Sequence, residues 1–330
     1  MTFNITCSNV NEAFSEMFWK LRTRKVDTRQ TRNGPALTFE GTFIINYLRP
    51  NERVLFHPGR DANPIFHLLE SVWMLAGRND VAFLEQFNSR IGQYSDDGVT
   101  FNAAYGYRWR RHFGFDQLKA VIELLKKDPN TRQAVIQMWD AADLIKTTKD
   151  KACNTQIVFE ARHGRLNMTV FNRSNDIWWG ACGANAVHFS VLQEFVATSA
   201  GLTVGLYRQV SSNMHLYTEL YDAQRYVEQP PSARDFDYYW LGQVTPRALM
   251  SYPDPELFLY ECEWFCINPF ANNPYKNAFL SHTARQLALV SAERRAGRSG
   301  LQEARAVGAA DWRRAAIEWV ERREEKKRST

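Results

Sequence analysis

The stretch KACNTQIVFEARHGRLNMTVFNRSNDIWWGACGANAVHFSVLQE, residues 151–194, decides the fold of this chain. Two runs of alternating apolar residues flank Arg162-His163-Gly164, and this pattern predicts a β-hairpin. The apolar residues after Asn185 have helical spacing, and Gly201 predicts where that helix ends. The centre of the chain therefore combines a sheet with a long helix.

Segments on both sides of this stretch extend the same pattern. NPIFHLLESVWMLAGRND predicts a buried helix over 64–76, and FDQLKAVIELLKKDPN predicts a second helix that Pro129 ends. RQAVIQMWD and TVGLYRQVSSNMHLY predict strands. Because strands and helices do not alternate strictly, the predicted fold class is α+β. Residues 225–280 are rich in Pro, Tyr and Phe and give no clear pattern.

Residues 281–328 differ from the rest in composition. They are rich in Ala, Arg and Glu, and two helical stretches are separated by AGRSG. We interpret them as an appended helical segment whose charges form a solvated face. The expected organisation is a main domain over 1–280 and a charged helical extension over 281–330.

Composition limits the class of protein. The 330 residues are 45% hydrophobic and 23% charged, no run of eighteen apolar residues occurs, and the N-terminus lacks a secretory pattern. We therefore expect a soluble cytoplasmic protein that does not span a membrane. Five scattered cysteines favour free thiols in a reducing compartment. The net charge of +5 suits a small anionic substrate better than a nucleic acid.

Cys153 is the first candidate for chemistry. A lone cysteine is by default a small buried apolar residue. Cys153 stands at the edge between a turn and a strand, where a side chain can face a cleft. Arg173, one hairpin away, would favour the thiolate that a nucleophile needs.

Arg173 and Ser174 together suggest a phosphate site, because a guanidinium matches phosphate oxygens in geometry. The alternative is a surface ion pair with Asp176. Arg32 and Arg132 could complete the cluster. Since neither type of glycine-rich phosphate loop occurs, side chains would hold the phosphate.

Other polar residues suit a base and a sugar. Asn185 offers an amide donor and acceptor for the O4/N3 edge of uracil, although it could equally cap a helix. His215 and Tyr217 alternate on a strand and could bind sugar hydroxyls, or be ordinary half-buried polar residues. Cys262 and Cys266 lack partner ligands nearby, so we expect no metal.

The order of these segments resembles the thymidylate synthase family, including its phage hydroxymethylase branch, from about residue 28 to 222. The similar segments are TRNGPALTFEG with Arg32, LLESVWMLAG with Glu70, YGYRWR with Tyr105, DPNTRQ with Arg132, the nucleophile motif at Cys153, NRSND with Arg173, Ser174 and Asp176, ANAVHF with Asn185, and NMHLY with His215 and Tyr217.

The resemblance implies an α+β sandwich on a large kinked sheet and a homodimer in which Arg132 serves the neighbouring site. It implies 5,10-methylenetetrahydrofolate as cosubstrate and a pyrimidine nucleoside monophosphate as substrate. The implied catalytic residues are Cys153, Glu70, Tyr105 and Asp176. The implied substrate-binding residues are Arg32, Arg132, Arg173, Ser174, Asn185, His215 and Tyr217.

Departures from the family pattern shape the expected reaction. Ala152-Cys153-Asn154 stands where the family has Pro-Cys-His, and Gln133 replaces a second arginine. The loop before Asn185 is one residue longer, so Ala184 could occupy the base-reading place. The family's short apolar C-terminus, which closes over folate, is replaced by the charged helices.

These departures favour addition of water over delivery of hydride, because hydride delivery needs a closed, dry site. The expected reaction is conversion of dUMP to 5-hydroxymethyl-dUMP, in a modified-nucleotide pathway such as that of a phage. Thymidylate synthesis and hydroxymethylation of dCMP or CMP stay open. A third alternative is a degenerate nucleotide-binding module whose C-terminal helices contact a partner or nucleic acid.

Overall fold

The computed structural model describes residues 1–219, 223–272 and 275–328, and its strands form two sheets. The large sheet has the order β1 (Thr2–Cys7), β4 (Thr42–Tyr47), β9 (Thr203–Ser211), β7 (Arg165–Asn172), β6 (Asn154–Arg162), β5 (Val135–Gln137). The small sheet has the order β2 (Val26–Thr31), β3 (Gly34–Phe39), β10 (Met214–Tyr217), β8 (Asn175–Asp176).

Helices make up most of the remaining structure. The helices are α1 (Val10–Thr23), α2 (Pro64–Leu75), α3 (Val81–Glu85), α4 (Tyr105–Tyr107), α5 (Gln117–Lys127), α6 (Asn185–Ser199), α7 (Gln224–Glu228), α8 (Pro255–Ile267), α9 (Arg285–Arg295), α10 (Leu301–Arg305) and α11 (Ala310–Arg328). Further helical segments with 3₁₀ or π geometry are η1 (Ile91–Tyr94), η2 (Arg108–His112), η3 (Ala141–Leu144), η4 (Ile177–Ala184), η5 (Ala233–Asp235) and η6 (Leu280–Ala284).

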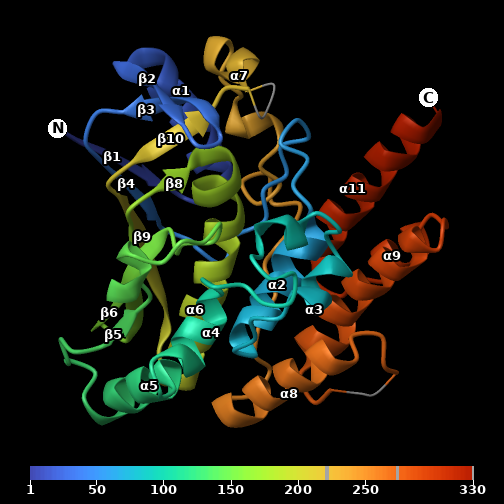
Figure 1. The fold of residues 1–330 in the computed structure, drawn as a ribbon. Coiled ribbons are helices and arrows are strands. Elements are labelled where there is room, and N and C mark those ends of the chain that lie inside the picture. Colours follow the sequence, from blue (N-terminus) through green and yellow to red (C-terminus); the bar gives the residue numbers. More distant parts are fainter. Residues whose placement is uncertain (220–222, 273–274, 329–330) are drawn as a thin grey trace.

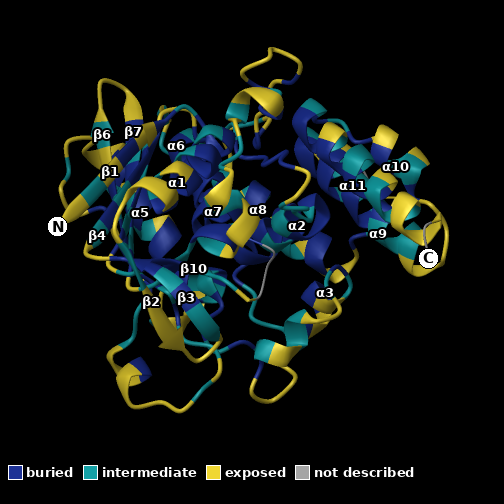
Figure 2. Ribbon diagram, turned by 90° about the horizontal axis from the view of Figure 1, so that it is seen from above, coloured by how far each residue is buried: buried dark blue, intermediate teal, exposed yellow. Residues whose placement is uncertain are grey.

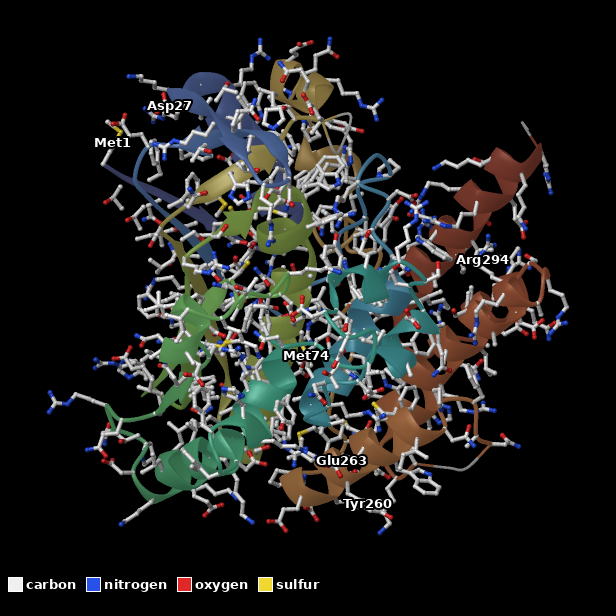
Figure 3. The ribbon with its side chains drawn as sticks, in the orientation of Figure 1. Met1, Asp27, Met74, Tyr260, Glu263 and Arg294 are labelled. Carbon is white, nitrogen blue, oxygen red and sulfur yellow. The ribbon has the colours of Figure 1, made fainter. Side chains whose placement is uncertain are left out.

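The elements form layers on one side of the large sheet (Figure 1). Helix α6 packs on the sheet, α2 packs on α6, and α8, α9 and α11 pack on α2. Almost every residue of α6 is buried, because the sheet covers one side and helices cover the other (Figure 2). Met74 of α2 lies in the interior, whereas Tyr260 of α8 lies at the outer surface (Figure 3).

The opposite face of the large sheet is only half-buried. Alternation along β6, β7 and β9 sends every second side chain to this face, including Val158, Thr169 and Leu206. These residues line a groove of about 230 Å³ together with the exposed Arg132. Half-buried apolar side chains on a broad sheet are typical of a surface that a partner covers.

The α+β class, the hairpin and the three central helices are confirmed. β6 and β7 pair antiparallel from Asn154 opposite Asn172 to Arg162 opposite Arg165. His163 and Gly164 form the turn with positive φ angles of 50° and 73°. None of the described helices is both long and apolar enough to cross a membrane.

The C-terminal region differs from the prediction of two helical stretches, because the second stretch is divided into α10 and α11. At the division, the Gly308 N–H donates to the carbonyl of His282 at 2.7 Å. A side chain at Gly308 would lie 2.9 Å from the His282 Cβ, so this close approach requires glycine. One face of these helices adds to the common core, with Leu287, Val290 and Val320 fully buried.

Candidate active site

Cys153 stands at the start of β6, as the sequence predicts, and Arg173 at the end of β7 lies against it. The Arg173 N–H donates to the carbonyl of Cys153 at 2.9 Å. Its guanidinium donates to the carbonyls of Ala152 at 2.8 Å and Lys151 at 3.1 Å. The hairpin therefore brings the thiol and its cation together, and the described contacts of Arg173 include no ion pair with Asp176.

The electrostatic surroundings of Cys153 act in opposite directions. Burial raises the pKa of the Cys153 thiol, and Arg173 and then Arg32 lower it, while Asp150 and Asp176 add to the rise. The net effect is a pKa above the ordinary value, so the thiol is protonated near neutral pH. A base must therefore take its proton before it can act as a nucleophile.

Lys151 and Arg173, whose backbones adjoin Cys153, line a pocket of about 580 Å³ that we call the outer basic pocket. Its lining contains four cations, Arg32, Lys146, Lys151 and Arg173. Arg32 reaches it from the turn between β2 and β3, and Tyr217 of β10 completes the wall. No acidic residue occurs among the described residues that line this pocket, so it is suited to a phosphate.

A smaller hollow of about 220 Å³, which we call the inner cavity, includes Tyr105, whose hydroxyl faces the backbone of Cys153. Its polar lining residues are Glu70, Tyr105, Asp150, Asn185 and His188. The remaining lining is mostly apolar or aromatic and includes Trp73, Met74, Leu84, Ile91, Tyr94, Phe101, Ala103, Ala104 and Ala184. Flat apolar walls with a few convergent polar groups suit a heterocyclic ring.

Glu70 and Tyr105 reach the inner cavity from different helices. Glu70 of α2 lies 3.1 Å from the Nε2 of His188, measured from a carboxylate oxygen. Burial raises the pKa of Tyr105 well above its ordinary value, and the Tyr105 hydroxyl faces the backbone of Cys153. A carboxylate, an imidazole and a phenol therefore surround the space beside the thiol.

The Asn185 side chain does not cap helix α6, although the sequence allowed that role. Its Nδ2 donates to the Oδ1 of Asn175 at 3.1 Å. The Tyr207 hydroxyl donates to the Asn185 carbonyl at 3.1 Å, which fixes the backbone. Since Ala184 carries no polar side chain, only Asn185 of these two cavity residues can read a base by hydrogen bonds.

His215 and Tyr217 share one face of β10, as predicted, and their ring centroids are 4.9 Å apart. His215 pairs in register with Asp176 of β8. The Asp176 Oδ1 accepts from the Trp179 N–H at 2.6 Å, while burial raises the pKa of Asp176 to about 6. Tyr217 of β10 therefore lines the outer basic pocket, and His215 of the same strand lies beside Asp176, whose charge acts on Cys153.

Among the described residues, Ser174 and Arg132 have no contact that links them to the two compartments as closely as the sequence predicts. Ser174 is half-buried beside Arg173 but lines neither the outer basic pocket nor the inner cavity. Arg132 lines the groove on the open sheet face, which shares no lining residue with either of them. Within a single chain, Arg132 is therefore not part of the site.

The sequence analysis missed several residues of the site. His188 lies three positions after Asn185 on α6, so helical spacing alone places both on one face. Lys151 is two residues before Cys153 and Asp150 is three before it. Lys146 gave no sequence signal, because its position depends on the path of the loop after η3.

Comparisons with known proteins agree with this geometry. The family model for thymidylate synthase matches residues 64–236. The chain is 44% identical to a deoxyuridylate hydroxymethyltransferase of Pseudomonas phage M6, over 97% of this chain and 94% of that protein. It is 39% identical to a deoxyuridylate hydroxymethyltransferase of Bacillus phage SP01, over 68% of this chain and 64% of that protein.

A thymidylate synthase of Symbiobacterium thermophilum is 31% identical over 53% of this chain and 70% of that protein. The phage proteins therefore share more of the chain, and more of its residues, than this bacterial synthase does. The family model matches more than half of the chain, and one relative is similar along nearly all of it. The chain therefore belongs to the thymidylate synthase family.

Proposed function

We propose that this enzyme converts dUMP to 5-hydroxymethyl-dUMP with 5,10-methylenetetrahydrofolate as cosubstrate. One observation carries the proposal: residues next to Cys153 line both a cation-rich pocket, through Lys151 and Arg173, and the cavity of Asn185 and Glu70, through Asp150 and Tyr105. A nucleotide needs these two compartments, one for phosphate and one for the base. The names of the phage relatives support the choice of hydroxymethylation.

The nucleotide would lie across the two compartments. Arg32 and Arg173 would hold the 5′-phosphate, and Ser174 would add a hydroxyl donor. His215 and Tyr217 on β10 would bind the sugar. Asn185 would read the pyrimidine edge, which places C6 of the base toward Cys153.

The chemistry follows from these positions. The Cys153 thiolate adds to C6, which makes C5 nucleophilic. The cosubstrate would supply a one-carbon unit that bonds to C5, and the aromatic walls of the inner cavity suit its flat pterin ring. Loss of the C5 proton and cleavage of the bond between the one-carbon unit and the folate nitrogen would release tetrahydrofolate and leave an exocyclic methylene on C5. Asn185 would stabilise the negative charge that develops on the pyrimidine. Glu70 and Tyr105 would hold the water that carries protons.

Completion of the reaction needs water at the exocyclic carbon. The water oxygen bonds to that carbon, its proton passes to a neighbouring base, and the Cys153 thiolate leaves C6 as the C5–C6 double bond forms again. Glu70 and His188 supply polar groups on the cavity wall for this step. None of the described residues after 280 lines the inner cavity, so the C-terminal helices do not cover it.

We also propose a homodimer with shared sites and a helical extension that begins near residue 280. The half-buried sheet face with Arg132 supports the dimer, because a second copy there would bring Arg132 to the neighbouring phosphate. The change in composition at residues 281–328, which are rich in Ala, Arg and Glu, supports treating 281–330 as an extension of the catalytic domain.

The product identifies the reaction. When the enzyme is incubated with dUMP, dCMP, UMP and CMP in turn, each with 5,10-methylenetetrahydrofolate, we expect hydroxymethylation of dUMP. Mass spectrometry identifies the nucleotide, and the folate gives an independent measurement, since hydroxymethylation leaves tetrahydrofolate whereas methylation leaves dihydrofolate. Thymidylate together with dihydrofolate would show that the enzyme delivers hydride instead. The absence of any nucleotide product would favour the binding module.

A further inference from the structure

A chain of buried amides ends at Asn185. The Gln209 Nε2 donates to the carbonyl of Ala181 at 3.1 Å. The Asn175 Nδ2 donates to the Gln209 Oε1 at 2.8 Å. The Asn185 Nδ2 then donates to the Asn175 Oδ1 at 3.1 Å. Gln209 is fully buried, and Asn175 and Asn185 are 2% and 8% exposed, so water does not compete freely for these groups.

The direction of this chain is set at its first member. A backbone carbonyl can only accept, so the Gln209 side chain must present Nε2 to Ala181 and Oε1 to Asn175. Reversing Asn175 would place its oxygen against the Gln209 Oε1, and neither of these two oxygens can donate to the other. The Asn175 Nδ2 also donates to the Ser211 Oγ at 3.0 Å, which uses its second hydrogen.

The orientation of the Asn185 side-chain amide follows in the same way. Its Nδ2 must face the Asn175 Oδ1, so one Nδ2 hydrogen is used and the other is available. The Asn185 Oδ1 has no hydrogen bond to any residue within 1–219, 223–272 and 275–328. The side chain lines the inner cavity, so an acceptor and one donor hydrogen are available there.

We propose that Gln209 and Asn175 are specificity-determining residues, which hold the Asn185 amide in the one orientation that selects uracil over cytosine. The N3–H of uracil donates to the Asn185 Oδ1 and its O4 accepts from Nδ2, whereas cytosine has an acceptor at N3 and a donor at N4. Reading cytosine would require all three amides to reverse and would set Gln209 against the Ala181 carbonyl. This inference rests on the proposed role of Asn185 and adds the residues that orient it.

The test is nucleotide binding without folate, measured by calorimetry for dUMP and dCMP. The unaltered enzyme should bind dUMP roughly tenfold or more tightly than dCMP, because the wrong base leaves buried groups unsatisfied. In Gln209→Met the amides lose their fixed direction, and the two affinities should come within roughly threefold of each other. The measured quantity is a ratio, so a general loss of affinity does not imitate the effect.

Gln193→Met is the matched control. Gln193 is also fully buried, and its amide donates to the carbonyls of Leu166 at 2.8 Å and Leu206 at 3.1 Å. Its replacement should lower stability comparably and leave the dUMP preference unchanged. An unchanged preference in Gln209→Met, or the same loss in Gln193→Met, would overturn the proposal.

Gln209→Glu provides a second test if the methionine variant does not fold. A protonated carboxyl can donate to Ala181 and accept from Asn175, and burial favours that protonated form. Either form of the carboxyl presents an oxygen that accepts from the Asn175 Nδ2, so the dUMP preference should survive in Gln209→Glu. Loss of the dUMP preference in this variant would count against the proposed role of Gln209.

The two proposals fail separately. Because binding is measured without folate, the proposed role of Gln209 and Asn175 stands even if the product is thymidylate. A preference of the unaltered enzyme for dCMP would overturn that role whatever the product is.

Discussion

Cys153→Ser should lower kcat by roughly a thousandfold or more, while dUMP still binds with similar affinity. A serine hydroxyl keeps the size of the side chain but ionises far less readily than a thiol, so addition to C6 fails. The phosphate contacts of Arg32 and Arg173 and the base contact of Asn185 do not depend on sulfur. The expected signature is therefore a loss in kcat without a matching loss in binding, measured by steady-state kinetics and calorimetry.

A covalent trap gives an independent measurement of the same step. With 5-fluoro-dUMP and 5,10-methylenetetrahydrofolate, the unaltered enzyme should form an adduct on the peptide that contains Cys153, whereas Cys153→Ser should form none. Cys262→Ser is the matched control, because Cys262 is a fully buried cysteine of α8. Appreciable turnover by Cys153→Ser, or an adduct on another residue, would exclude the proposed mechanism.

The sequence predicted the parts of the site that short-range geometry determines. A hairpin places its two ends together, so Cys153 and Arg173 could be paired before the structure was known. Alternation placed His215 and Tyr217 on one face of a strand for the same reason. These relations follow from local periodicity and do not depend on the packing of distant elements.

Other parts of the site depend on packing between distant segments. Gln209 on β9 meets Asn175 on β8 only because the chain between them forms α6 and returns along the sheet. Alternation places Gln209 on the same strand face as Tyr207 but says nothing about its partner. The pairing of Glu70 with His188 likewise requires α2 to pack on α6. Such contacts are tertiary, so a single sequence does not specify them.

A large recovery of activity is expected when two inactive variants, one of them altered at Arg132, are mixed as dimers. Arg132→Ala should lose most activity by losing a phosphate contact, and Cys153→Ser is inactive for the reason above. In a dimer with shared sites, a mixed pair would contain one site with both Cys153 and Arg132. If subunits exchange at random, half of the dimers are mixed and each has one intact site out of two, so activity should recover to about a quarter of the unaltered level.

Arg173→Ala mixed with Cys153→Ser is the control, and its outcome follows from the contacts of Arg173. That guanidinium donates to Ala152 and Lys151 of its own chain, so it serves the same site as its own Cys153. Every site in that mixture lacks one of the two residues, and no activity should return. Recovery only with Arg132→Ala would place Arg132 across the interface. If exchange is verified by mass-labelled subunits and activity still fails to return, Arg132 does not act in the neighbouring site, and the open sheet face needs another explanation.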